Sequence, residues 1–91
     1  MRARVADNVI FESLGDQLVL LNLDTSHYFN LKGSGPRVWE LIQEHGNLDR
    51  VLSAMASEYR MEAGALEGDL HELVRDLEAR GLIVVDRQPT P

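Results

Sequence analysis

The sequence predicts an α+β fold of the winged helix-turn-helix type, with a three-stranded antiparallel meander followed by three helices and a short C-terminal strand. Three observations favour this class. The N-terminal third holds short runs of aliphatic and aromatic residues that Gly and Asp separate. From Pro36 to Arg80, apolar residues recur at helical spacing in three segments with short breaks between them. The run Leu82–Val85 is too short for a helix and is typical of a strand.

Length and composition describe one small globular domain, which we expect to span residues 5–85, with a tail at 86–91. The chain has 91 residues, of which 44% are hydrophobic and 26% charged. It contains no apolar run of about 18 residues and no basic leader before an apolar stretch, so we expect no membrane span and a cytoplasmic location. Because it has no Cys, it offers no disulfide, thiolate nucleophile or Cys-ligated metal site.

Three strands are expected at Val9–Glu12, Gln17–Leu23 and His27–Leu31. If Asp24-Thr25-Ser26 is a three-residue loop, alternation places on the core face Val19, Leu21, Leu23, Phe29 and Leu31. The opposite face then carries Leu18, Leu20, Asn22, Tyr28 and Asn30. That face is more apolar than a solvated face needs to be. We therefore interpret part of it as a contact for a partner protein or for a second copy of the chain in a homodimer.

The first two helices follow from their caps as well as from their spacing. Pro36 suits a first helical turn, Ser34 is a candidate N-cap, and Gly46 supplies a left-handed stop. This helix is expected to bury Val38, Trp39, Leu41 and Ile42, with Trp39 as a core anchor. Asn47 can cap a second helix that ends near Arg60 and buries Leu48, Val51, Leu52, Met55 and Tyr59.

A third helix is expected to start between Glu62 and Leu66, to end at Gly81 and to bury Leu66, Leu70, Leu73, Val74 and Leu77. In a DNA-binding winged helix this segment would enter the major groove. Here its acidic residues outnumber its two Arg, and the whole chain has a formal net charge of −6. Because carboxylates that face phosphates oppose binding, we expect neither a nucleic-acid partner nor an anionic membrane partner.

Several short motifs occur in a characteristic order, namely Tyr28-Phe29-x-Leu31, Gly35, Val38-Trp39-x-Leu41, Asp69-Leu70-x-x-Leu73 and Gly81-Leu82-Ile83. Their order and spacing resemble the pyrroloquinoline quinone biosynthesis protein D (PqqD) family over about Val9 to Val85. The chain departs from the family pattern at Lys32, where Asn is common. The Tyr28-Phe29 pair and the spacing to Gly35 are most similar to the stand-alone recognition proteins of lasso peptide gene clusters.

This resemblance implies a non-catalytic precursor-peptide recognition element without a cofactor. It would bind a leader peptide as an added strand and deliver it to a leader peptidase or another maturation enzyme. The resemblance places the leader against the third strand, in a groove beside the third helix. The expected peptide-binding residues are His27, Tyr28, Phe29, Asn30, Leu31, Glu67, Leu70, His71, Leu73, Val74, Leu77 and Glu78. Acidic residues at the rim of this groove would favour a leader that carries Lys or Arg.

Two other functions stay open at this point. One is a PqqD-type chaperone for a radical enzyme in quinone cofactor biosynthesis, and the other is an acidic winged-helix protein that acts in transcription. A small enzyme is disfavoured, because the sequence has no convergent cluster of His and carboxylates and no glycine-rich phosphate loop. His27, His45 and His71 lie on separate expected elements without metal-ligand spacing, so we expect no metal site.

Overall fold

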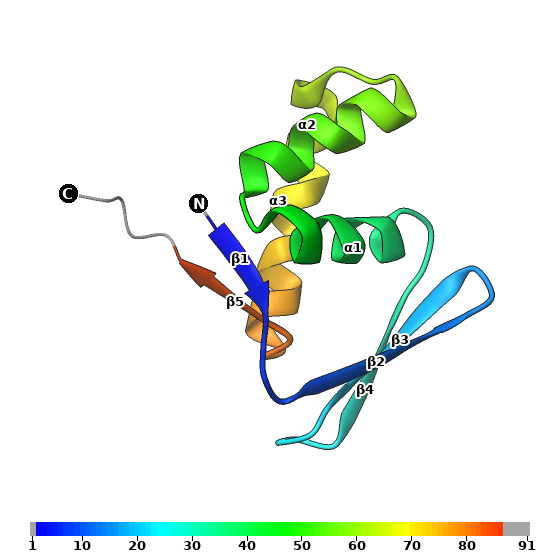
Figure 1. The fold of residues 1–91 in the computed structure, drawn as a ribbon, viewed down its shortest axis with the longest axis vertical. Helices are drawn as coiled ribbons and strands as arrows, with labels where there is room; N and C mark the ends of the chain where they lie inside the picture. The colour runs from blue at the N-terminus through cyan, green and yellow to red at the C-terminus, as the bar shows by residue number, and fades with distance from the viewer. Residues whose placement is uncertain (1, 87–91) are drawn as a thin grey trace.

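The structure is a computed structural model that describes residues 2–86. In chain order the elements are β1 (Arg2–Val5), β2 (Val9–Leu14), β3 (Gln17–Asn22), β4 (His27–Leu31), α1 (Gly35–His45), α2 (Leu48–Tyr59), α3 (Ala63–Ala79) and β5 (Ile83–Asp86). Strands β2, β3 and β4 form the predicted antiparallel meander, and β1 pairs with β5 in a separate two-stranded sheet (Figure 1). The predicted fold class is confirmed.

The register of the meander differs from the prediction because the loop between β3 and β4 has four residues, Leu23 to Ser26, instead of three. Ser26 closes this loop in the left-handed conformation, with φ of 61°. Leu18 and Leu20 therefore lie opposite Leu31 and Phe29. A shift of one residue moves every side chain of a strand to its other face.

The predicted core face of β3 is consequently wrong. Leu18, Leu20 and Asn22 are buried, with exposed fractions of 4%, 0% and 4%, whereas Val19 and Leu21 are half-buried and Leu23 is exposed. The prediction for β4 holds, since Leu31 is buried, Phe29 packs against the core, and Tyr28 and Asn30 are exposed.

Helices α1 and α2 begin and end where their caps predicted. Gly46 adopts a φ of 71° after α1, and the side chain of Asn47 accepts hydrogen bonds from the backbone N–H groups of Asp49 and Arg50. Ser34 occupies the N-cap position of α1, although its side chain makes no capping hydrogen bond. One predicted core residue of α2 is wrong: Tyr59, the last residue of the helix, is 43% exposed.

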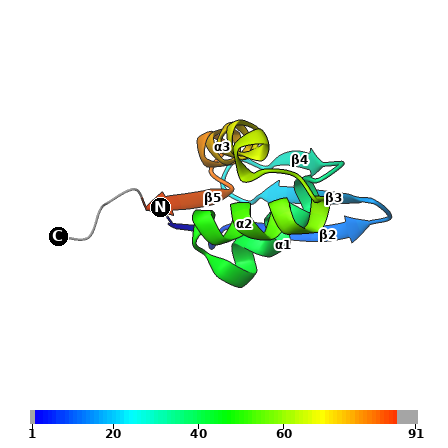
Figure 2. The same ribbon diagram turned by 90° about the horizontal axis from the view of Figure 1, so that it is seen from above.

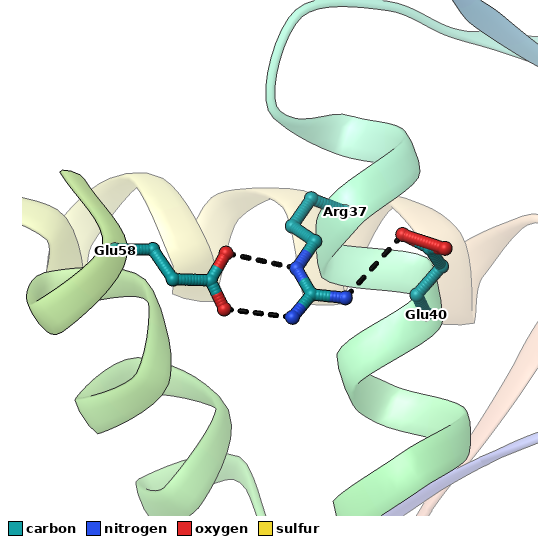
Figure 3. Close-up of polar contacts among 3 residues, drawn as sticks. All are labelled: Arg37, Glu40 and Glu58. Atoms are coloured by element: carbon teal, nitrogen blue, oxygen red, sulfur yellow. Dashed lines mark hydrogen bonds and ion pairs between the residues drawn. The ribbon is translucent and has the colours of Figure 1, made fainter.

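A salt bridge connects α1 to α2 on the surface (Figure 3). Arg37 donates two hydrogen bonds to Glu58, from Nε at 2.8 Å and from Nη2 at 2.7 Å, and its Nη1 lies 3.5 Å from Glu40. The hydrogen bonds from Arg37 hold the pKa of Glu58 below its ordinary value of 4.5, against an opposing effect of desolvation. This contact joins the surfaces of two helices that also share a core.

Strand β1 was not predicted, and it forms a two-stranded sheet with β5. Arg2–Val5 pairs antiparallel with Ile83–Asp86, and the backbone N–H of Ala3 donates to the carbonyl of Gly46 at 2.7 Å. This pair of strands extends beyond the expected range of 5–85 at both ends, by Arg2 to Arg4 and by Asp86. The rest of the expected tail, residues 87–91, lies outside the described residues.

The core lies between the helices and the inner face of the meander. It includes Leu20, Trp39, Leu41, Leu77 and Leu82, each at most 1% exposed. Helix α3 contributes Leu70, Val74 and Leu77, as predicted, with Leu66 and Leu73 partly buried beside them. Seen from above, α3 lies on the same side of the molecule as β4, whereas α1 lies toward β2 (Figure 2). Within residues 2–86, no helix is long and apolar enough to cross a membrane.

Candidate functional site

Strand β4 is an edge of the meander, because the strand order is β2, β3, β4. In an antiparallel strand, successive residues point their backbone N–H and C=O groups alternately to the two sides. The groups of β4 that point away from β3 have no strand partner among residues 2–86. Such an edge can pair with the backbone of another chain.

The other edge, β2, is also unpaired within the described range, so position in the sheet does not by itself select β4. Each edge also borders a hollow, one of about 390 Å³ between β2 and α1, and one of about 250 Å³ between the first residues of β4 and the C-terminal end of α3. What distinguishes the hollow beside β4 is that a guanidinium, that of Arg80, lines it, whereas no Lys or Arg of the described residues lines the one beside β2. The hollow beside β4 is lined by residues that include Asn22, Thr25, His27, Phe29, Arg80 and Leu82. An added strand along β4 would therefore pass over a recess that can receive one of its side chains.

Arg80 lies over the aromatic ring of Phe29 in this hollow. Its Cζ atom is 4.4 Å from the ring centroid, a cation–π contact between the end of α3 and the inward face of β4. Its Nε donates to Asp76 Oδ1 at 3.2 Å, one helical turn earlier. The guanidinium is therefore held beside β4, while the side chain as a whole is 53% exposed.

Asn22 fixes the end of α3 relative to the turn between β3 and β4. Its Nδ2 donates to the backbone carbonyl of Arg80 at 2.9 Å, while its Oδ1 accepts from the backbone N–H groups of Asp24 at 2.9 Å and Thr25 at 3.3 Å. Gly81 allows this approach: its φ is 72°, and a Cβ there would lie 3.0 Å from Asn22 Nδ2. The position of Arg80 is thus set by a buried polar residue.

The predicted peptide-binding residues fall into an exposed and a buried group. On β4, His27, Tyr28 and Asn30 are exposed, Phe29 is half-buried and Leu31 is buried. On α3, Glu67 and His71 are exposed, Leu73 and Glu78 are half-buried, and the buried residues are Leu70, Val74 and Leu77. The last three belong to the core of the peptide-free chain, so any contact they make with a leader would be at the floor of a groove. Their role in binding stays a prediction.

Sequence reasoning missed Asn22, Arg80 and Leu82 as parts of this site. The signal for Asn22 was a single polar residue within an apolar strand, but the wrong register placed it on the outer face. Arg80 carried no periodic signal, because it lies at the helix end, where its neighbours depend on the tertiary fold.

The outer face of the meander is apolar, as predicted, but different residues form it. We use the name outer face for Ile10, Leu14, Val19, Leu21 and Tyr28. Ile10, Leu21 and Tyr28 form one row across the three strands, with Ile10 54% and Tyr28 71% exposed. Tyr28 lies both in this face and on the free edge strand, so the two surfaces are continuous.

No group of three or more His, Asp or Glu side chains within the described range is arranged to hold a metal ion. The three histidines are distributed over β4, α1 and α3. The arrangement of the described residues can supply backbone hydrogen bonds, a recess and a fixed guanidinium, which suits peptide binding.

Comparisons with known proteins identify the family of the chain. The family model of coenzyme PQQ synthesis protein D (PqqD) matches residues 17–83. The solved structure of TbiB1 in complex with the TbiA(beta) leader peptide is 30% identical, with a TM-score of 0.83, and the match covers 91% of this chain and 99% of that chain. A lasso peptide synthetase B1 complexed with the leader peptide has the same fold at 20% identity, with a TM-score of 0.82 and coverage of 93% and 100%. No curated protein gives a significant match. Because the family model spans most of the sequence, this chain belongs to the PqqD family.

Proposed function

We propose that this chain is a non-catalytic module that binds the leader of a ribosomally made precursor peptide and delivers it to a maturation enzyme. The observation that carries the proposal is the free edge of β4 beside the hollow at the end of α3. The chain is also 30% identical, over nearly its whole length, to a protein solved with a leader peptide. The leader would add to the meander as a fourth strand.

Two kinds of contact, backbone hydrogen bonds and side-chain contacts, would bind the leader. Backbone hydrogen bonds to β4 give affinity that does not depend on leader side chains, while recesses beside the strand select them. We assign the backbone contacts to His27 through Leu31. The side-chain contacts fall to the predicted residues of α3, Glu67, Leu70, His71, Leu73, Val74, Leu77 and Glu78, together with the hollow at Arg80. The exposed carboxylate of Glu67 would favour basic leader residues at that part of α3.

The maturation enzyme, a leader peptidase in a lasso-type pathway, would contact the outer face. Two features support this occupant over a second copy of the chain. Each copy carries a formal net charge of −6, which opposes self-association. The outer face also continues into the edge where the leader would add, so an enzyme docked there would reach the bound peptide. We place this encounter in the cytoplasm, where ribosomes release the precursor.

The binding test is titration calorimetry of the full chain with two probes, the leader of any short precursor encoded beside its gene and the TbiA(beta) leader. Hydrogen exchange then locates the added strand. We expect binding to protect amides of β4 that face away from β3, and to leave the amides of β2 unchanged. Protection of β2 alone, or no heat of binding with either leader, would contradict the proposal.

The genes beside this one separate the lasso pathway from the quinone pathway. A peptidase and an asparagine-synthetase-like cyclase would support the lasso form, whereas a radical enzyme would support the quinone form. The similarity of the Tyr28-Phe29 pair and the Gly35 spacing to lasso recognition proteins favours the first.

A further inference from the structure

We propose that Arg80 is a specificity-determining residue that binds an Asp or Glu side chain of the added peptide strand. This inference rests on the proposed function and deepens it, because it names a side-chain class that the hollow beside Phe29 selects. The other charged residues of α3 are mainly Asp and Glu, so the overall charge of the helix predicts a preference for basic peptide residues. A site for an acidic residue at the C-terminal end of α3 differs from that prediction.

Three contacts hold Arg80 in place before any ligand arrives. The guanidinium stacks 4.4 Å from the centroid of Phe29, Nε is 3.2 Å from Asp76, and the backbone carbonyl accepts from Asn22 at 2.9 Å. These contacts leave the Nη1 and Nη2 groups without a hydrogen-bond acceptor among residues 2–86. Part of the side-chain entropy that Arg loses on binding has thus already been lost in the free protein.

The two free groups match a carboxylate in shape as well as in charge. Adjacent guanidinium N–H groups donate to both oxygens of a carboxylate at once, a geometry that Lys cannot reproduce. The hollow has an apolar floor, because Leu82 is 1% exposed and Phe29 packs on the core. Thr25 and His27 supply polar walls. The methylene groups of a Glu side chain would lie on this floor with the carboxylate at Arg80.

Nearby carboxylates leave room for this partner. Asp76 occupies only Nε of Arg80, and Asp24 Oδ2 already accepts from Asn8 Nδ2 at 2.7 Å. The charge that a peptide meets therefore changes along α3, from exposed Glu67 near its start to Arg80 at its end. A leader with an acidic residue at one end of the strand and a basic residue at the other would be held in one register and one direction.

The test is a double-mutant cycle between the chain and a leader that binds it in the titration above, the TbiA(beta) leader being the first probe. Each Asp and Glu of that leader is replaced in turn by its amide, and each peptide is titrated into the wild type and into Arg80→Gln. We expect one replacement to weaken binding to the wild type about fivefold, as for a partly exposed ion pair of ~1 kcal/mol, and to change nothing for Arg80→Gln. Arg75→Gln on the same helix is the matched control and should keep the wild-type response.

Arg80→Lys separates bidentate binding from charge alone, and it should recover less than half of the loss in binding free energy. The inference is overturned if every amide-substituted leader binds the wild type as well as its parent does, if the loss persists in Arg80→Gln, or if a leader without acidic residues binds as tightly. Thermal unfolding midpoints within about 2 °C of each other show that the variants are folded. A wild type that binds no leader at all contradicts the proposed function itself, and is recognised before any variant is made.

Discussion

Trp39 is the side chain on which the packing of the small core depends most. It is 1% exposed, and its ring meets that of Phe11 edge to face at 5.4 Å between centroids. We expect Trp39→Ala to lower the free energy of unfolding by about 3 to 5 kcal/mol, because it opens a cavity in a core that cannot collapse around it. Chemical denaturation measures the loss.

Trp39→Phe is the informative companion variant. The indole Nε1 is buried and has no hydrogen-bond acceptor within the described residues, so replacing it removes an unsatisfied donor along with some volume. The cost should therefore be well below that of Trp39→Ala. An equal loss in the free energy of unfolding for the two variants would contradict a stabilising role for the volume of the Trp39 ring.

Asn22 shows how one buried polar residue positions the candidate site. Asn22→Ala would leave the Arg80 carbonyl and the N–H groups of Asp24 and Thr25 without their partner, at an expected cost of about 1 to 3 kcal/mol. Asn30→Ala is the control, because Asn30 is exposed and makes only a long 3.4 Å contact with Gln17. Urea midpoints that fall equally for both variants would contradict this role.

Local signals explain which residues could be predicted from sequence. Asn47 and Gly46 were identified correctly because a cap acts on its own helix, and Trp39 because helical spacing places it among apolar residues. Asn22 and Arg80 were not identified, since they contact each other across 58 positions of the sequence. No local pattern records such a contact.

At the level of elements, the register of the meander was the error with the widest consequence. Both faces of Gln17–Leu23 carry leucines or valine, so alternation alone does not say which face is buried. The length of the turn decides which face is buried. The four-residue loop ends in a left-handed conformation at Ser26, and Ser is not a residue type from which that conformation is predicted. The strands themselves were predictable, whereas their pairing was not.

The free edge of β4 leads to a prediction about strand addition. Asn30→Pro disturbs the backbone of β4 at the middle of the proposed ladder, so leader affinity should fall about tenfold or more while the helical circular dichroism signal persists. Ser13→Pro makes the same change on the other edge, β2, and should leave affinity unchanged. Equal losses for the two variants would show that the leader does not add at β4.

The bridge between α1 and α2 predicts a stability that depends on pH. Because Arg37 lowers the pKa of Glu58 in the folded chain, the stabilisation is fully present above the ordinary pKa of 4.5 and is lost as pH falls through the lowered value. The difference in melting temperature between the wild type and Glu58→Gln should therefore be largest near neutral pH and shrink toward zero in acid. A difference that stays constant down to about pH 3 would contradict this contribution.

On the scale of the whole molecule, the fold class was predictable because spacing, caps and turns all agree on it. Strand β1 was not, since four residues of mixed polarity become a strand only by pairing with β5 at the other end of the chain. The site was predicted as a strand and a helix, and this placement followed from the family resemblance. The resemblance did not provide the hollow at Arg80.

The acidic surface of α3 should act on a bound leader through long-range attraction. Glu67 and Glu72 are exposed, so their attraction for a basic leader is screened by salt, with a Debye length of about 8 Å at 0.15 M and about 3 Å at 1 M ionic strength. We expect Glu67→Lys with Glu72→Lys to slow association at low salt and to have little effect at high salt.

Stopped-flow association measured across a salt series tests this, with Glu44→Lys on α1 as a control at another exposed Glu, away from the site. A loss of affinity that persists at 1 M salt would mean that these carboxylates make close contacts with the peptide and do not only attract it.

The same double variant also tests why this winged-helix scaffold does not suit DNA. If the carboxylates of α3 are the reason, the variant should gain salt-sensitive binding to duplex DNA at low ionic strength, and the native chain should show none.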